Sequence, residues 1–215
     1  NARILGANFK AELVEDTGDE WRRNLLLNGS FENGVVGWSR TGPSMQYIDA
    51  TKHLYGAQSL KFSLLDDTII QDSRVRQDIH VPVGHKVYFS SWMYVPSNTY
   101  NGKPIIRHRM SDYGGYNNTI DIQPVEDDLL ELDKWNRFSI IKTVEPETSG
   151  VRAELTAYHD VGTAFELFLD DCMMIDLTAM FGAGNEPSVE QCDVIFSNWT
   201  PAPEDYANYD YENKE

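Results

Sequence analysis

The stretch Asn28-Gly29-Ser30-Phe31-Glu32, followed by Gly37-Trp38, decides how this chain is interpreted. It comes directly after the apolar run Leu25-Leu26-Leu27, which we expect to be a short strand that the Asn-Gly turn ends. Far downstream, the apolar run Phe168-Leu169-Asp170-Asp171-Cys172-Met173-Met174 carries two adjacent carboxylates. If folding brings Glu32 to this last strand, carboxylate oxygens meet there, and oxygen ligands are what hard cations such as calcium prefer. The two motifs therefore predict a β-domain that a cation stabilises.

The composition narrows the class of protein. The 215 residues are 41% hydrophobic and 12% aromatic, which is typical of a folded globular chain long enough to bury a core. Asp and Glu number 34 against 18 Lys and Arg, so the formal net charge is −16. A surface this acidic repels phosphates, which excludes nonspecific nucleic-acid binding but is compatible with neutral glycans and divalent cations. No apolar run approaches the roughly 18–20 residues that span a bilayer, so we expect no membrane insertion.

Short runs of strand-like alternation recur along the middle of the chain. In residues 59–65, for example, Leu60, Phe62 and Leu64 alternate with polar side chains. Gly- and Pro-containing turns separate the runs, and no long helix intervenes. The pattern predicts an all-β fold, a jelly-roll β-sandwich of two antiparallel sheets. We expect strands over 59–65, 74–81, 86–95, 104–110, 119–125, 136–144, 151–160 and 164–175.

The two ends of the chain differ from this middle part. Residues 1–23 are polar and carry a charge cluster, so we interpret them as an N-terminal linker or docking segment. We assign the sandwich to residues 24–180. In residues 181–199, Ser188 and Gln191 form a capping-box pattern that predicts a short C-terminal helix packed on the sandwich. The Pro-rich start of residues 200–215 indicates an exit linker.

The two cysteines, Cys172 and Cys192, are too few for a disulfide framework. We expect buried free thiols, although a bridge between the two is not excluded by the sequence.

Several motifs, taken in order, resemble the carbohydrate-binding modules of the family 4/9/22 jelly-roll type. They are Asn28–Glu32 with Trp38, then Tyr55–Leu60, Val87–Trp92 and Leu169–Asp171, so the resemblance covers roughly residues 24–176. It implies a calcium ion held by Glu32 and by one of Asp170 or Asp171, with backbone oxygens completing the shell. Since neighbouring side chains on a strand face opposite ways, only one Asp can point inward unless a bulge intervenes, and we lean to Asp171. The alternative is that Glu32 caps a turn and that the Asp pair lies at a solvated strand edge.

A second resemblance lies near the end of the chain. Residues 174–188 (MIDLTAMFGAGNEPS) and 199–205 (WTPAPED) are similar to the ending of sugar-binding-like modules in bacteriophage tail proteins. Those modules belong to tail fibres, baseplates and receptor-binding proteins of phages that infect Gram-positive bacteria and their relatives. The resemblance implies a virion location, extracellular action, and two kinds of partner: host cell-surface or cell-wall polysaccharide and other tail proteins.

The candidate ligand residues follow from strand parity and from how modules of this type bind sugars. Aromatic planes pack on sugar faces, and planar polar side chains bind the hydroxyl groups. We expect one sheet face to hold the following candidate ligand residues: Trp92, Tyr94, Arg107, Arg109, Asp121, Gln123 and Tyr158. Trp92 could equally belong to the core, and the charged residues could be paired surface ions. The loop Tyr113-Gly114-Gly115-Tyr116-Asn117-Asn118 is a second candidate, although an ordinary hairpin connection explains it as well.

Catalysis has little support in the sequence. The five histidines lack the HExxH spacing of zinc enzymes, and neither a GxSxG elbow nor a phosphate-binding P-loop occurs. We therefore expect a non-catalytic module of a phage tail protein that adheres to host surface polysaccharide. The first alternative is a structural spacer of the tail or baseplate without glycan binding. A distant alternative is the binding module of a secreted glycoside hydrolase.

Overall fold

The structure is a computed structural model that describes residues 24–42, 45–66, 71–102, 104–115, 118–159, 161 and 163–197. The expected linkers over 1–23 and 200–215 lie outside the described residues, as do residues 198–199 at the end of the expected helical segment.

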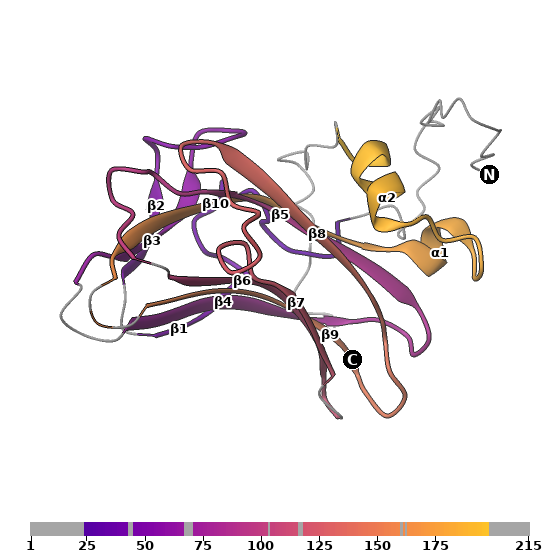
Figure 1. The fold of residues 1–215 in the computed structure, drawn as a ribbon. Coiled ribbons are helices and arrows are strands. Elements are labelled where there is room, and N and C mark those ends of the chain that lie inside the picture. Colours follow the sequence, from indigo (N-terminus) through magenta and orange to yellow (C-terminus); the bar gives the residue numbers. More distant parts are fainter. Residues whose placement is uncertain are drawn as a thin grey trace.

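The described residues form ten strands in two five-stranded sheets, and every strand pairing is antiparallel. Sheet A has the order β1 (Ser39–Thr41), β4 (Gln71–His80), β9 (Gly150–His159), β6 (Ile105–Tyr113) and β7 (Thr119–Ile122). Sheet B has the order β2 (Met45–Asp49), β3 (Ser59–Leu64), β10 (Phe165–Asp176), β5 (Lys86–Tyr94) and β8 (Trp135–Thr143). Figure 1 shows the sheets as two layers. The predicted jelly-roll β-sandwich is confirmed.

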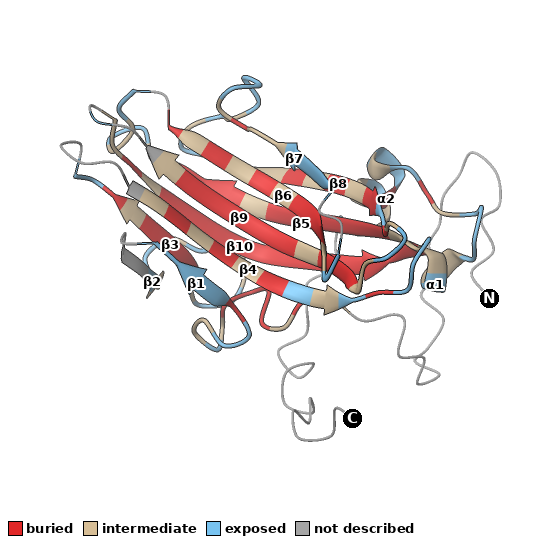
Figure 2. Cartoon of the chain, turned by 90° about the horizontal axis from the view of Figure 1, so that it is seen from below, coloured by how far each residue is buried: buried red, intermediate tan, exposed pale blue. Residues whose placement is uncertain are grey.

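The core lies between the sheets because each strand turns every second side chain inward. On β9 the buried inward residues are Val151, Ala153, Leu155 and Ala157, and β3 contributes Leu60, Phe62 and Leu64 from the opposite sheet. Figure 2 shows the result as buried and half-buried residues that alternate along β4 and most of β6, whereas β9 in the middle of the sheet is buried along most of its length. One side of each sheet is therefore committed to the core, and the other side remains for function.

Two polar links cross this apolar core and join sheet A to sheet B. His108 on β6 stacks on the ring of Phe89 and shares a 2.8 Å hydrogen bond with the Ser91 hydroxyl group. Its Nε2 lies 3.2 Å from the carbonyl oxygen of Phe89. Because a carbonyl can only accept, Nε2 carries the proton and Nδ1 accepts from Ser91. The second link is a buried ion pair of 2.9 Å between Asp112 Oδ2 and Lys142 Nζ.

Two short helices, α1 (Leu177–Phe181) and α2 (Val189–Ile195), follow the last strand and lie at one end of the sandwich (Figure 1). They cover part of the outer side of sheet B with a second apolar cluster, which is made of Tyr88, Met173, Ile175, Leu177, Cys192 and Phe196. The capping box at Ser188 and Gln191 is confirmed. Helix α1 was not predicted from the sequence. Asp176 caps its N-terminus.

Three strand assignments at the start of the sandwich differ from the sequence expectations. Residues 25–27 are not a strand, because the N–H groups of Leu26 and Leu27 donate to the side chains of Asn24 and Gln77 rather than to a strand ladder. The short edge strands β1 and β2 were not predicted. Both cysteines are buried free thiols, as expected, and they lie in different apolar clusters. No helix in the described part of the chain is long and apolar enough to cross a membrane.

Candidate functional site

The outer side of sheet A is polar from edge to edge. On β4, β6, β7 and β9 the side chains that alternate with the core residues point away from the core, and Figure 2 looks onto this side. Both described helices lie against sheet B instead. We call this surface the sheet A face and define it by the outward residues Asp72, Arg74, Arg76, Asp78, Arg107, Arg109, Ser111, Asp121, Arg152, Glu154, Thr156 and Tyr158.

Strand register arranges the charges of this face in rows across the sheet. One row runs Asp121, Arg109, Glu154 and Arg76 on β7, β6, β9 and β4, so its charges alternate in sign. The next row places Thr156 between Arg107 and Arg74. Directly opposed side chains on neighbouring strands lie close enough to interact, which explains how residues far apart in the sequence form one network.

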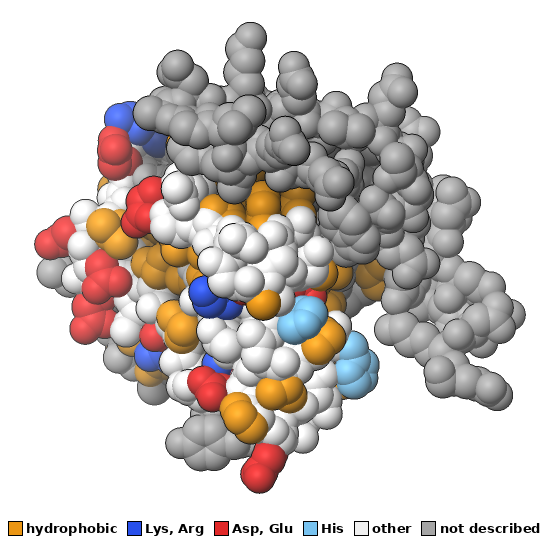
Figure 3. All heavy atoms as spheres, turned by 90° about the vertical axis from the view of Figure 1, so that its right-hand side faces the viewer, with side chains coloured by type: hydrophobic (Ala, Val, Ile, Leu, Met, Phe, Trp, Pro, Cys, Tyr) orange, Lys and Arg blue, Asp and Glu red, His pale blue; other side chains and the backbone are white. Residues whose placement is uncertain are grey.

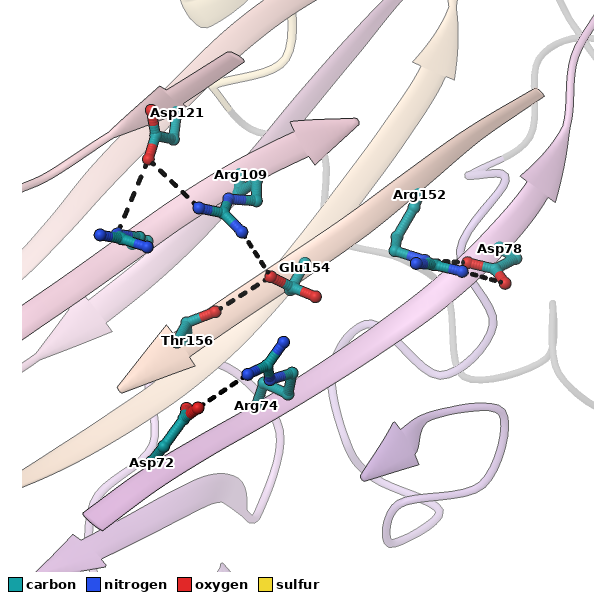
Figure 4. Close-up of polar contacts among 9 residues, drawn as sticks. Asp72, Arg74, Asp78, Arg109, Asp121, Arg152, Glu154 and Thr156 are labelled. Carbon is teal, nitrogen blue, oxygen red and sulfur yellow. Dashed lines mark hydrogen bonds and ion pairs between the residues drawn. The ribbon is translucent and has the colours of Figure 1, made fainter. Parts of the chain in front are cut away.

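Glu154 is the buried centre of this network, with a side chain that is only 5% exposed. Its Oε1 accepts a hydrogen bond of 3.1 Å from Arg109 and another of 3.2 Å from the Thr156 hydroxyl group (Figure 4). A buried carboxylate needs such charged partners, since its desolvation is costly otherwise. The Arg109–Glu154 pair therefore holds the middle of the face in place.

Asp121 is shared by two arginines at distances longer than a hydrogen bond. Its Oδ2 lies 3.8 Å from Arg107 Nε and 3.7 Å from Arg109 Nη2. The Nε atoms of Arg107 and Arg109 are both buried and have no hydrogen-bond partner among the described residues. The two guanidinium groups thus keep donor capacity that the protein itself does not use.

Two further ion pairs flank the network (Figure 4). Arg152 binds Asp78 with two hydrogen bonds of 2.6 and 2.9 Å, and this guanidinium holds the pKa of Asp78 below its usual value. Arg74 Nη2 donates to Asp72 at 2.7 Å. These arginines are therefore more fully engaged than Arg107.

The expectation that one sheet face carries both Trp92 and Arg107 is wrong. Trp92 and Tyr94 lie on β5 of sheet B and point outward on the opposite side of the sandwich, because Val87, Phe89 and Met93 occupy the inward positions of that strand. Arg107, Arg109, Asp121 and Tyr158 share the sheet A face. Gln123 follows β7 in a turn in which its N–H donates to Asp127. Consecutive strands of a jelly roll can enter different sheets, and parity within one strand cannot reveal which.

Tyr94 belongs to an aromatic row across sheet B. Tyr47, Lys61, Phe168, Tyr94 and Trp135 are in register on all five strands. Tyr94 is 9% exposed, because Lys52 lies over its ring at 4.3 Å and donates to its hydroxyl group at 3.2 Å. Trp92 is half-buried, with the Arg137 guanidinium 6.0 Å from its ring. The two rings do not form an open platform with the arginines of sheet A.

The entry motif and the end of β10 meet at the loop over residues 54–58. Glu32 Oε1 accepts from the N–H groups of Ala57 and Gln58 at 2.9 and 3.1 Å. Asp170 Oδ2 accepts from the N–H groups of Leu54 and Tyr55 at 2.7 and 3.1 Å. Folding therefore brings the two carboxylates of the opening motifs to the same loop.

A β-bulge turns β10 at the Asp pair. The register with β5 shifts between Asp170 and Met173, and Asp171 has a positive φ of 46°. Burial raises the pKa of Asp170 to about 6. Burial, together with the neighbouring charge of Asp170, raises the pKa of Asp171 to about 7. The bulge thus concentrates two carboxyl groups whose ionised forms are poorly solvated.

These oxygens can be tested against the requirements of calcium, which takes about 6–8 oxygen ligands, including backbone carbonyls. Asp171 Oδ1 is buried and has no hydrogen-bond partner in the part of the chain that the structure describes, which is compatible with an oxygen that binds a cation. The described residues hold no group of three or more His, Cys, Asp or Glu side chains that could bind a metal by themselves. Glu32, Asp170 and Asp171 therefore fit a hard cation only if backbone oxygens supply much of its shell.

Strand β4 holds four of the site residues that the sequence analysis missed, and Arg152, Glu154 and Thr156 on β9 and Ser111 on β6 were also outside the predicted set. Arg74 and Arg76 face Thr156 and Glu154 across the sheet, and Asp72 and Asp78 continue the outward set on the same strand. The signal was present as the alternation Asp72-x-Arg74-x-Arg76-x-Asp78, in which every second residue is charged. A strand in which four successive outward side chains are charged indicates a face that is more than solvated surface.

Neither protein-family models nor curated proteins match this sequence. The fold is similar to several solved structures. A family 61 carbohydrate-binding module in complex with β-1,4-galactotriose aligns over 72% of this chain and 99% of its own, with 19% identity and a TM-score of 0.54. A family 16 carbohydrate-binding module aligns over 71% and 99%, with 14% identity and a TM-score of 0.51. The enzymatically active domain of tailspike protein 4 of bacteriophage CBA120 aligns over 70% and 21%, with 13% identity and a TM-score of 0.52. At these identities the similarity concerns the fold.

Proposed function

We propose that this chain is a non-catalytic glycan-binding module of a bacteriophage tail protein, and that it adheres to polysaccharide on the host surface. The observation that carries the proposal is the sheet A face, on which arginines, carboxylates, Thr156 and Tyr158 lie together on a rigid sheet. Planar polar groups next to an aromatic ring are suited to sugar hydroxyl groups and sugar faces.

The comparisons support this function without establishing it. Two structures of similar fold are described as carbohydrate-binding modules, and one of those is in complex with a galactotriose. The phage setting, the virion location and the tail-protein partners are supported by the similarity of residues 174–188 to phage tail modules and by the tailspike structure. Fold similarity alone does not transfer a function, so the binding face itself has to be tested.

Binding of the full 215-residue chain to a glycan array and to purified bacterial cell-wall polysaccharides tests the proposal. We expect Arg107→Ala to weaken binding by tenfold or more, since a hydrogen bond to a charged group contributes about 1.5–3 kcal/mol. Trp92→Ala, on the opposite side of the sandwich, is the matched control and should change affinity less than twofold. Unchanged thermal unfolding of both variants shows that the fold is intact. Absence of binding to any glycan would favour the alternative of a structural spacer.

A spacer would be expected to present a broad apolar surface to neighbouring tail proteins. On the coloured part of the end of the sandwich seen in Figure 3, apolar side chains form separate patches between polar atoms. The large apolar residues that are exposed, such as Val83 on a turn and Val194 on α2, come from different elements. This distribution favours glycan adhesion over a purely structural role.

We also propose that a structural calcium ion joins the entry motif to β10 through Glu32, Asp170 and Asp171. The ion would offset the repulsion between the two buried Asp carboxylates and pair with the free Asp171 oxygen. A cation that binds only the folded state, at a concentration 100 times its Kd, stabilises that state by about 2.7 kcal/mol.

Thermal unfolding in about 5 mM calcium and in excess EDTA tests whether the ion stabilises the fold. We expect EDTA to lower the Tm of the wild-type chain and to have little effect on Asp171→Asn, which removes one charge at the bulge. Glu131→Gln is the control, because Glu131 is exposed and forms its ion pair with Lys134, away from the bulge. A wild-type Tm that is the same in both solutions would rule out a stabilising ion.

A further inference from the structure

We infer that the ligand of the sheet A face is an acidic polysaccharide whose carboxylate groups bind Arg107 and Arg109. The inference rests on the proposed glycan-binding function and specifies the chemical class of glycan.

The first argument is the distribution of arginine. Seven arginines lie among the described residues, and five of them point outward on the sheet A face: Arg74, Arg76, Arg107, Arg109 and Arg152. The same face carries four carboxylates, namely Asp72, Asp78, Asp121 and Glu154. Five positive against four negative charges leave this face at +1, whereas the whole chain carries −16. The face is thus a local positive region on a strongly acidic protein.

The second argument is the unused donor capacity of two of these arginines. Arg107 has one ion pair among the described residues, the 3.8 Å contact with Asp121, and its buried Nε has no acceptor. Arg109 binds Glu154 with one nitrogen atom, and its Nε likewise has no acceptor. A guanidinium group presents its donors as a planar fork that matches both oxygens of a carboxylate. The Nε atoms are buried, but the Arg107 and Arg109 side chains as a whole are 34% and 25% exposed, so a ligand carboxylate would bind the terminal nitrogen atoms of these groups.

The third argument is the position of the aromatic rings. Neutral sugars are held largely by aromatic platforms, yet the rows that contain Arg107 and Arg109 carry no aromatic side chain among the described residues. Tyr158 lies beside them, two residues beyond Thr156 on β9, and it is half-buried. One sugar ring can therefore pack on Tyr158 while the carboxylate of its neighbour binds Arg107.

The overall charge of the chain does not prevent this binding. At physiological ionic strength the Debye length is about 8 Å, so carboxylates on the opposite sheet and on distant loops are largely screened at the face. The charge that the ligand meets is that of its immediate surroundings. The local excess of arginine is consequently more relevant to recognition than the net charge of −16.

Asp121 gives the inference a sharp test, because it competes with the ligand for the same two arginines. Its side chain is 28% exposed and, among the described residues, its ion pairs are the two long contacts with Arg107 and Arg109. Asp121→Asn should free both guanidinium groups and increase affinity for an acidic polysaccharide by threefold or more. A purely structural role of Asp121 predicts no gain in affinity.

The experiment measures binding of the full chain to polygalacturonate, to its methyl-esterified form, to neutral β-1,4-galactan and to a glycerol-phosphate polymer at physiological ionic strength. We expect at least tenfold tighter binding to polygalacturonate than to the esterified form. Arg107→Gln should remove most of this difference, and Arg107→Lys should lose at least half of it because the lysine lacks the fork. Lys134→Gln is the control and should bind within about twofold of wild type, because it removes a positive charge from an exposed residue outside the sheet A face that pairs with Glu131.

The possible outcomes separate the inference from the proposed function. Equal binding to the acid and ester forms, or tightest binding to neutral galactan, overturns the inference and leaves glycan binding intact. Tightest binding to the phosphate polymer also overturns it, since phosphate rather than carboxylate would then be the recognised group. Absence of binding to all four polymers and to a wider glycan array contradicts the proposed function itself.

Discussion

At the residue scale, His108 shows how a polar side chain is accommodated in the core and how its protonation makes the stability of the fold depend on pH. The ring is fully buried between the sheets, and burial lowers the pKa of His108 to about 3. In the unfolded chain the pKa is about 6.5. Below pH 6.5 the unfolded state therefore takes up a proton that the folded state refuses, so stability is complete above that pH and decreases as the pH falls toward 3.

Because of His108, we expect the free energy of unfolding to be about 2 kcal/mol lower at pH 5 than at pH 7, since one pKa unit corresponds to about 1.4 kcal/mol. Urea unfolding of the wild-type chain and of His108→Gln at both pH values measures this difference. His108→Gln has no imidazole to protonate, so its free energy of unfolding should decrease less between pH 7 and pH 5 than that of the wild type. At pH 7 we expect the variant to be less stable than the wild type. His53→Gln is the control, because His53 is exposed. An identical pH dependence in wild type and His108→Gln would contradict the prediction.

At the scale of single elements, the capping box of α2 should control local rather than global stability. Ser188 accepts from the Gln191 N–H group, and the Gln191 side chain accepts from the Ser188 N–H group. Loss of such a cap typically costs about 1 kcal/mol. We expect Ser188→Ala to speed hydrogen exchange of the helical Cys192 and Phe196 amides about fivefold and to leave core amides of β9 unchanged. Ser188→Asp keeps an acceptor at this position and should exchange like wild type. Equal acceleration throughout the sandwich would show that α2 does not open on its own.

The strands and the α2 cap could be predicted from the sequence because their signals are local. Alternation of apolar and polar residues is visible in the strands over 59–64 and 150–159, and the cap needs only four residues. Residues 25–27 could not be assigned correctly, because the acceptor that replaces their ladder is Gln77, which is fifty positions away. The bulge at Asp171 likewise depends on the pairing of β10 with β5. Interactions between distant segments are therefore what the local pattern leaves undetermined.

At the scale of the whole molecule, the candidate site depends on which strands share a sheet. Arg107 and Glu154 become neighbours because β6 and β9 pair, and Trp92 is separated from them because β5 belongs to the other sheet. Parity within each strand was predictable, but the choice of sheet is decided by pairings across more than forty residues. Strand patterns taken one at a time therefore predicted Arg107, Arg109, Asp121 and Tyr158 but combined them with Trp92 and Tyr94 from the opposite side of the sandwich.

The two sheets are also joined by a buried ion pair, and its removal should be among the most destabilising changes to the sandwich. Asp112 on β6 and Lys142 on β8 are 0% and 1% exposed, and Asp112 additionally accepts from the N–H groups of Asn118 and Glu145. Lys142→Met leaves the Asp112 carboxylate buried without its cation, which typically costs about 3–5 kcal/mol. In the double variant Lys142→Met with Asp112→Asn, no charge is buried and the backbone donors keep an acceptor, so we expect much of the loss to be recovered. A double-mutant cycle from urea unfolding measures this coupling. If the two substitutions were additive, the ion pair would not contribute to the link between the sheets, which would then depend on apolar packing around Phe138 and Ile140 and on the hydrogen bonds of His108.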